Sequence, residues 1–375
     1  MKKICVALTL LLCLLQPTVA FADVVGELVD SVNDGLGNID FSDFDSVGSD
    51  FVGSAAEKIR KIVNGEFDDA SDFFSVFVEL FFAEFTQILP QLLSLFAVMI
   101  ICGILRRTSG GFVSQSTEEV VSFVGVAVSI SVVLSLVAKV FVATSDLLGK
   151  VSALSEASAP ITLALLIANG NVALQSVYRT STVIFSSLII GLVKSVILPL
   201  AGFSVVFGVV SRLSGNLRVE KLSSFFSNLS AWILGVAFML FSAFTATQGI
   251  TAGSVDGVSV RAAKFAAKNY IPFLGGYVAE GLDLVLASSA LIKNAFGAVA
   301  LLVLLWLVFK PVAYVLCVNL GLQIVGAICQ PVAEDKFVKL LASVEKNLNF
   351  FVALIVAVAF MFAIQVLITL GISSV

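Results

Sequence analysis

The stretch that decides the fold is "AFGAVALLVLLWLVFKPVAYVLCVNLGLQIVGAIC", residues 295–329, an almost unbroken apolar run with one lysine, Lys310, followed by Pro311. A helix of 35 residues, at about 1.5 Å per residue, measures about 52 Å, whereas the hydrocarbon core of a bilayer is about 30 Å thick. The stretch therefore predicts one of two structures: a single tilted or kinked membrane helix, or two short helices that meet at Lys310.

The rest of the chain is also strongly hydrophobic and poor in charge. Hydrophobic residues make up 59% of the 375 residues and charged residues only 13%, with a mean hydropathy of +1.07. Soluble domains carry about twice that share of charge. Further apolar runs cover residues 88–105, 120–143, 180–210, 229–245 and 350–370. We expect an all-α, multi-pass helical membrane protein of about six to eight spans, with six or seven favoured over the eight that splitting both long blocks would give.

The two long blocks resemble each other. Residues 180–210 contain Lys194 and Pro199, residues 295–329 contain Lys310-Pro311, and each block is followed by a charged loop and a further apolar run. This order of features predicts an internal duplication of about 115 residues, with broken-helix hairpin units at 144–249 and 250–375 after a first transmembrane hairpin at 88–143. Chance similarity between hydrophobic segments is the alternative.

The N-terminus has the pattern of a secretory signal peptide. In "MKKICVALTLLLCLLQPTVAFAD", two lysines precede a short apolar core, and Ala20-Phe21-Ala22 forms a small-x-small cleavage site. The sequence thus predicts a signal peptide at residues 1–22. The alternative is an uncleaved first membrane helix.

The segment that follows, residues 23–87, is strongly acidic. It holds 15 acidic and 3 basic side chains, whereas residues 88–375 hold 11 acidic and 17 basic. We expect an extracytoplasmic region that begins loosely and ends in an amphipathic helix, whose apolar face lies on the outer membrane surface or docks a partner protein. That face comprises Phe73, Phe74, Phe77, Leu80 and Phe81. If residues 23–87 lie outside the cell, Arg106-Arg107 lies on the cytoplasmic side of the first span. This orientation agrees with the excess of lysine and arginine in the cytoplasmic loops of membrane proteins.

No pattern in the sequence points to catalysis. The chain has no histidine, and neither a phosphate-binding glycine loop nor a nucleophile elbow is present. The five cysteines show neither a disulfide framework nor metal-ligand spacing. We therefore predict no catalytic residue, no metal and no cofactor, and a membrane enzyme is the least favoured class.

Charges within apolar sequence are the intramembrane candidates. Lys194 and Lys310 could line a polar path or pair with Glu280 or Asp283, or could reach the headgroups from a helix break near the interface. The second interpretation is favoured. Three amides, Asn319, Gln323 and Gln365, are interpreted as interhelical hydrogen-bond partners rather than substrate ligands.

A further candidate lies in residues 256–294, between two apolar blocks. Arg261, Lys264 and Lys268 share one helical face, and the opposite face is lined by small residues that allow another helix to approach closely. Pro272 and Gly275-Gly276 are expected to end this helix. The segment is interpreted as a tightly packed cationic hinge between two hydrophobic units, with an ordinary solvated loop as the alternative.

The stretch "GITAGSVDGVSVRAAKFAAKNYIPFLGGYVAEGLDLVLASSALIKNAFG", residues 249–297, resembles the stage III sporulation protein AE family of endospore-forming bacteria. The similarity lies in its D-G-(x)3-R-x-A-K-F core and the N-x-I-P-x-L-G that follows. The signal, the extracytoplasmic region and the multi-span remainder also follow that family's layout, although residues 23–87 cannot be matched residue by residue.

This resemblance implies a subunit of the stage III sporulation A complex in the mother-cell membrane around the forespore, meeting a forespore-side partner across the intermembrane space. Such a subunit would be a non-catalytic scaffold or pore component of a channel or secretion-like apparatus. A permease that moves a small substrate through the duplicated core is the alternative. The assembly or hinge candidates on this basis are Asp256, Gly257, Arg261, Lys264, Phe265, Pro272 and Gly275, with Lys268 from the cationic face.

Overall fold

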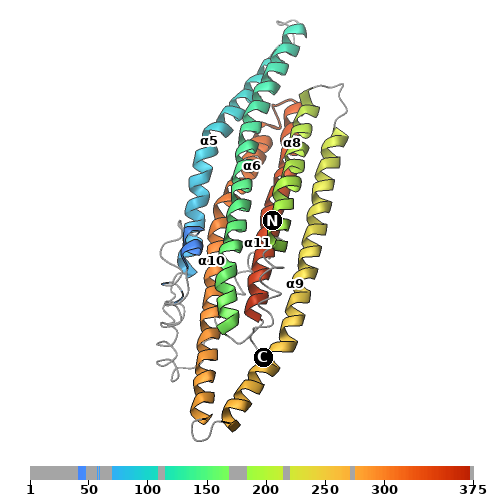
Figure 1. The fold of residues 1–375 in the computed structure, drawn as a ribbon. Helices are drawn as coiled ribbons and strands as arrows, with labels where there is room; N and C mark the ends of the chain where they lie inside the picture. Colours follow the sequence, from blue (N-terminus) through green and yellow to red (C-terminus); the bar gives the residue numbers. More distant parts are fainter. Residues whose placement is uncertain are drawn as a thin grey trace.

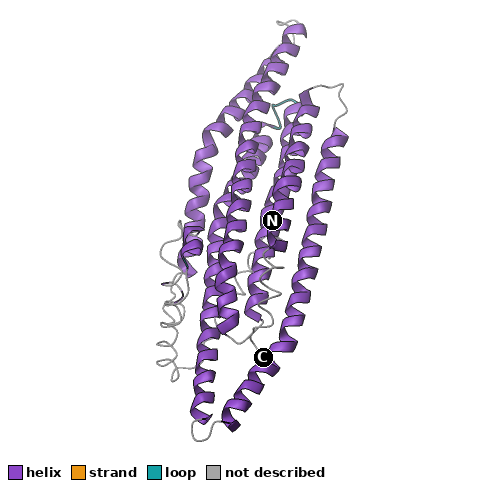
Figure 2. Cartoon of the chain, viewed as in Figure 1, coloured by secondary structure: helices purple, strands orange, loops and turns teal. Residues whose placement is uncertain are grey.

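The computed structural model describes residues 41–47, 57, 59, 70–108, 115–168, 184–213, 220–270 and 275–371. Over these ranges the chain is an elongated bundle of long helices without a strand, which confirms the predicted all-α class (Figures 1 and 2). The elements are α3 (Ser42–Val47), α5 (Ala70–Thr108), α6 (Gln115–Ala168), a helix over 184–213 that includes the π-helical turn η1 (Val193–Ile197) and α8 (Leu198–Leu213), α9 (Glu220–Tyr270), α10 (Gly275–Cys329) and α11 (Asp335–Gly371).

Six helices in the described part of the chain are long and apolar enough to cross a membrane. This result confirms the predicted multi-pass helical membrane protein at the lower end of the expected number of spans. The spans are Val78–Leu105, Glu119–Leu165, Ile184–Ser211, Glu220–Thr247, Ala287–Cys329 and Asp335–Leu367.

The block that contains Lys310-Pro311 is a single helix. Helix α10 runs for 55 residues without interruption, with Pro311 inside it. A proline removes one backbone hydrogen bond and crowds the carbonyl four residues before it. Within a membrane, however, breaking the helix would expose further backbone groups to lipid, so the helix continues around the proline. The two-helix interpretation of this block is therefore wrong.

The other long block is also continuous, but it contains a local bulge. At η1 the Leu198 N–H donates to the Val193 carbonyl, five residues back instead of four. Pro199 follows directly, and its ring would crowd the Ser195 carbonyl in a regular α-helix. The wider π turn relieves that crowding without ending the helix. The break predicted at Lys194 and Pro199 is thus a bulge within one span.

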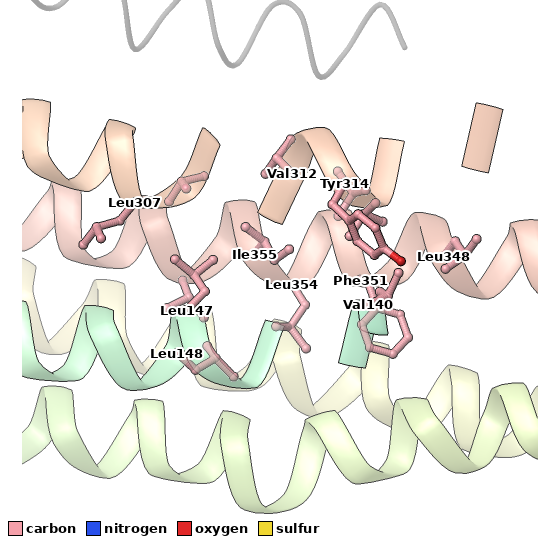
Figure 3. Close-up of a cluster of buried hydrophobic side chains, with 14 of the residues drawn as sticks. Val140, Leu147, Leu148, Leu307, Val312, Tyr314, Leu348, Phe351, Leu354 and Ile355 are labelled. Atoms are coloured by element: carbon pink, nitrogen blue, oxygen red, sulfur yellow. The ribbon is translucent and has the colours of Figure 1, made fainter. Parts of the chain in front are cut away.

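Helix α10 forms the centre of the bundle and packs against α11, α5, α6 and α9. Of the most apolar window of its span, 72% is buried within the protein, compared with 28% for α9. Figure 3 shows side chains from three helices meeting in this core, among them Leu147 from α6, Leu307 from α10 and Leu354 from α11. The hydrophobic block that decides the fold therefore lies in the candidate span that is most covered by other helices among the six in the described residues.

Part of the acidic region packs on the bundle. Phe41 and Phe44 are buried, and their rings lie 6.2 and 5.2 Å from the ring of Phe296 on α10. The expectation of a loose start to residues 23–87 is wrong for α3. The first candidate span also begins earlier than the apolar run at 88, at Val78 within α5, and the half-buried Phe81 packs against the core.

Helix α6 runs through the predicted unit boundary at 143/144. Its 54 residues include Pro160, and the helix continues past that proline. In the other half of the chain, α9 ends at Tyr270 and α10 begins at Gly275. The two halves thus differ in where their helices end, and the internal duplication is not shown. Residues 1–22, the predicted signal peptide, lie outside the described residues.

Candidate functional site: the α9–α10 hairpin and the polar contacts of the bundle

The predicted assembly candidates gather at one end of the molecule. Those between Asp256 and Lys268 lie on the last turns of α9, and Gly275 is the first residue of α10. Pro272 lies outside the described residues, as do the side chains of this hairpin. In Figure 1 the ends of α9 and α10 reach farther than the neighbouring helices at this end of the bundle. The backbone thus presents the resemblance-bearing segment on the tip of a helical hairpin.

The end of α9 lies where Pro272 predicts it. The helix stops at Tyr270, two residues before Pro272, and α10 begins at Gly275. The residue before a proline is sterically disfavoured in the helical region, so helices end at or before it. The helix end predicted from Pro272 agrees with α9 ending at Tyr270, whereas Gly275 and Gly276, also expected to end this helix, are the first residues of α10.

Lys194 and Lys310 are both exposed on the outside of the bundle. Lys194 lies beside α6, where a Cβ added to Gly149 would be 3.6 Å from the lysine Nζ. Pairing of Lys310 with Glu280 or Asp283 is excluded, because all three lie on the continuous α10. At about 1.5 Å per residue, the separation along this helix is about 40 Å or more.

Three charged residues that the sequence interpretation missed are buried. Lys293 on α10 is 1% exposed, Glu84 on α5 is 6% exposed, and Glu334, just before α11, is 7% exposed. The sequence places Lys293 at the edge of an apolar block beside Asn294, which is typical of a side chain at the membrane surface. Only the tertiary structure, which places α10 at the centre, shows that this lysine lies inside the bundle.

Serine and asparagine side chains join α8, α9 and α11. The Ser204 hydroxyl lies 2.8 Å from both the Ser223 carbonyl oxygen and Asn347 Oδ1, and the Ser223 hydroxyl donates to the Ser204 carbonyl at 2.7 Å. Gly208 allows this close approach, because a Cβ there would lie 2.8 Å from Ser343 Oγ and 3.1 Å from Ser223 Oγ. All three hydrogen-bonding side chains are buried. This serine–asparagine cluster fixes how the three helices cross.

Two of the predicted amides form interhelical hydrogen bonds. Gln365 on α11 accepts from Ser186 at 2.9 Å and from Ser155 on α6 at 3.4 Å. Asn319 on α10 donates from Nδ2 to Asn349 Oδ1 on α11 at 2.8 Å. Gln323 instead donates to Asn319 within α10 at 3.2 Å. The interhelical prediction is thus confirmed for Asn319 and Gln365, and wrong for Gln323 as a direct partner.

The chemistry available in the described ranges is that of helix association. Cys102, Cys317 and Cys329 are buried, and no group of three or more histidine, cysteine, aspartate or glutamate residues in those ranges could hold a metal. Serine–carbonyl and amide–amide contacts instead tie neighbouring helices together, and in lipid such bonds are worth about 0.6 kcal/mol each on average.

The comparisons with known proteins bear on the hairpin and on most of the chain. A family model described as stage III sporulation protein AE matches residues 54–373. The chain belongs to the stage III sporulation protein AE family. The resemblance found in residues 249–297 is therefore confirmed.

One relative is the stage III sporulation protein AE of Bacillus subtilis (strain 168). It is 28% identical over 215 residues, which cover 56% of this chain and 54% of that protein. The matched part thus spans about half the length of the relative. No solved structure matches this chain.

Proposed function

We propose that this chain is a non-catalytic integral membrane subunit of a sporulation complex, acting as a scaffold or pore component of a channel or secretion-like apparatus between mother cell and forespore. The family match over residues 54–373 carries the proposal. The six apolar helices agree with an integral subunit, and the polar contacts among them hold helices together.

In this proposal the α9–α10 hairpin is the assembly surface. Asp256, Arg261, Lys264 and Lys268 lie along the last turns of α9, which Figure 1 places at an extended end of the bundle. Charged residues arranged along a helix select and orient partners more than they add affinity. The partners are the other stage III sporulation A membrane proteins, with a forespore-side protein across the intermembrane space, and the chain resides in the mother-cell membrane around the forespore.

The alternative, a permease, was motivated by helices broken at Lys194 and Lys310. Transporters of that design place substrate and ion ligands at discontinuous helices near the midplane. Here α10 passes through Lys310-Pro311 without a break and the lysine is exposed on the outside. The observations therefore favour the scaffold or pore component.

The test replaces the native gene in a spore-forming host with a tagged copy of the full chain. We expect loss of the chain to arrest forespore development and the tagged chain to co-purify with the other stage III sporulation A membrane proteins. Substituting Ala263→Leu and Ala267→Leu should abolish this co-purification, because bulky side chains prevent close helix approach.

The matched control is Ala231→Leu, the same change at an exposed position of the same helix. It should leave both co-purification and spore yield at the level of the unmodified chain. Transport of a substrate by the purified chain alone in vesicles would instead support the permease. Normal spores from the Ala263→Leu, Ala267→Leu strain would contradict the proposed assembly surface.

A further inference from the structure

A polar cleft of about 260 Å³ lies between the first turns of α9 and the first half of α11. The cleft is lined by Glu220, Ser223, Ser224 and Ser227 of α9 and by Lys339, Ala342, Ser343, Lys346 and Asn347 of α11.

The lining consists of two helical faces with the same spacing. On α9 the lining residues fall at i, i+3, i+4 and i+7 from Glu220, and on α11 at the same intervals from Lys339, with Asn347 added at i+8. Such residues form one stripe of a helix. The serine–asparagine cluster described above borders the cleft through Ser223 and Asn347, so the two stripes are held at a fixed separation.

The chemistry of the lining favours an anion. Lys339 and Lys346 supply two ammonium groups against one carboxylate, Glu220, and the lining also holds four serines and the Asn347 amide. Of the serine hydroxyls, that of Ser223 already donates to the Ser204 carbonyl. The cleft also adjoins the N-terminus of α9, where backbone N–H groups favour negative charge. Lysine and hydroxyl donors around a space of this size suit a phosphate group.

The surroundings indicate that the phosphate comes from a lipid. The cleft adjoins the start of two candidate spans, Glu220–Thr247 and Asp335–Leu367. Leu222 and Phe225, on the same turns of α9, are 44% and 57% exposed, so an apolar surface lies next to the polar one. Basic pockets between membrane helices bind the headgroups of anionic lipids.

We propose that this cleft binds the phosphate of an anionic phospholipid, with Lys339 and Lys346 as the cationic ligands and the serine hydroxyls as donors. The acyl chains then lie against the apolar surface around Leu222 and Phe225. A lipid held in this way joins α9 to α11, and so stabilises the position of α9.

The test measures the thermal unfolding midpoint of the purified full chain in neutral detergent, followed by tryptophan fluorescence. The additions are phosphatidylglycerol, phosphatidylcholine and inorganic phosphate, each in a separate sample. A ligand that binds only the folded state raises the midpoint. We expect a rise of several degrees with phosphatidylglycerol, little change with phosphatidylcholine, and little change with inorganic phosphate.

Two variants locate the effect. Lys339→Gln with Lys346→Gln should remove most of the rise, and Ser224→Leu should do the same by filling the cleft without changing charge. The matched control is Lys194→Gln with Lys310→Gln, which removes two exposed lysines elsewhere on the bundle and should keep the full rise.

Each other outcome overturns the proposal. Equal rises in all variants would mean that the lipid acts on the general surface rather than in the cleft. A rise of the same size with inorganic phosphate would identify a soluble phosphate site in place of a lipid site. No rise with phosphatidylglycerol in the unmodified chain would show that no such lipid site exists.

Discussion

Helices α9 and α10 are nearly equal in length, 51 and 55 residues, and form the two arms of one hairpin. They differ in how much of each is covered by other helices. Their candidate spans have mean hydropathies of 1.9 and 2.4, but the most apolar window is 28% buried in α9 and 72% buried in α10. On α9, Trp232 and Met239 are 68% and 71% exposed. In a bilayer an exposed apolar side chain is as well solvated by lipid as by protein, so hydropathy identifies both spans without distinguishing core from periphery.

The largest difference in unfolding free energy should come from truncating one leucine on each helix to alanine. Leu322 on α10 is fully buried, so Leu322→Ala leaves a cavity and should cost about 2–5 kcal/mol of unfolding free energy. Leu240 on α9 is exposed, and Leu240→Ala should stay within about 0.5 kcal/mol. Reversible unfolding of the purified chain in mixed micelles measures both. Equal costs would refute the assignment of α10 to the core.

Alanine substitutions at two glycines should change the free energy of unfolding in opposite directions. A Cβ at Gly103 on α5 would collide with the backbone carbonyl of Val332, which cannot move away, so Gly103→Ala should destabilise the fold by about 1–3 kcal/mol. A Cβ at Gly235 on α9 meets nothing within 4 Å, so Gly235→Ala should stabilise by up to about 1 kcal/mol through helix propensity. The same unfolding measurement applies. Destabilisation by Gly235→Ala would show that α9 is covered by protein at that point.

The smallest effect concerns the cluster that attaches α9 to the bundle. Ser204→Ala removes the hydroxyl that lies within hydrogen-bond distance of both the Ser223 carbonyl and Asn347 Oδ1. This change should lower the free energy of unfolding by about 1 kcal/mol. Ser195→Ala, which removes only a bond to the Gly191 carbonyl of its own helix, serves as the control and should cost less than half as much. A double-mutant cycle of Ser204→Ala with Asn347→Ala should give a coupling of about 0.6 kcal/mol. Additive costs would mean that the two side chains act independently.

The sequence alone predicted several features that rest on local chemistry. The multi-pass helical fold, though not the number of spans, follows from apolar length. The end of α9 follows from Pro272, and the interhelical bonds of Asn319 and Gln365 follow from the cost of unpaired amides in lipid. Each of these depends on a few neighbouring residues or on composition, which the sequence displays directly.

The features that escaped prediction depend on contacts between distant segments. Pro311 looked like a helix break, but lipid offers a broken helix no alternative hydrogen-bond partner, so α10 continues. Lys293 is buried because other helices surround it. The polar residues that follow Glu220 on α9 and Lys339 on α11 are far apart in the sequence. They line one cleft only because α8, α9 and α11 cross closely at Gly208.

The central claim is that the α9–α10 hairpin, rather than the buried core, carries the assembly of a sporulation complex. The most direct measurement uses a host strain whose chain carries Arg261→Glu and Lys264→Glu, with Lys336→Glu, an exposed reversal on α11, as the control. Recovery of the other stage III sporulation A membrane proteins with the tagged chain is quantified from isolated membranes, alongside spore yield. We predict that the hairpin variant is inserted at normal levels but loses those proteins and arrests spore formation, while the control retains both. Recovery of the complete complex with the hairpin variant would contradict the claim, and arrested spores in that case would favour a direct role in transport.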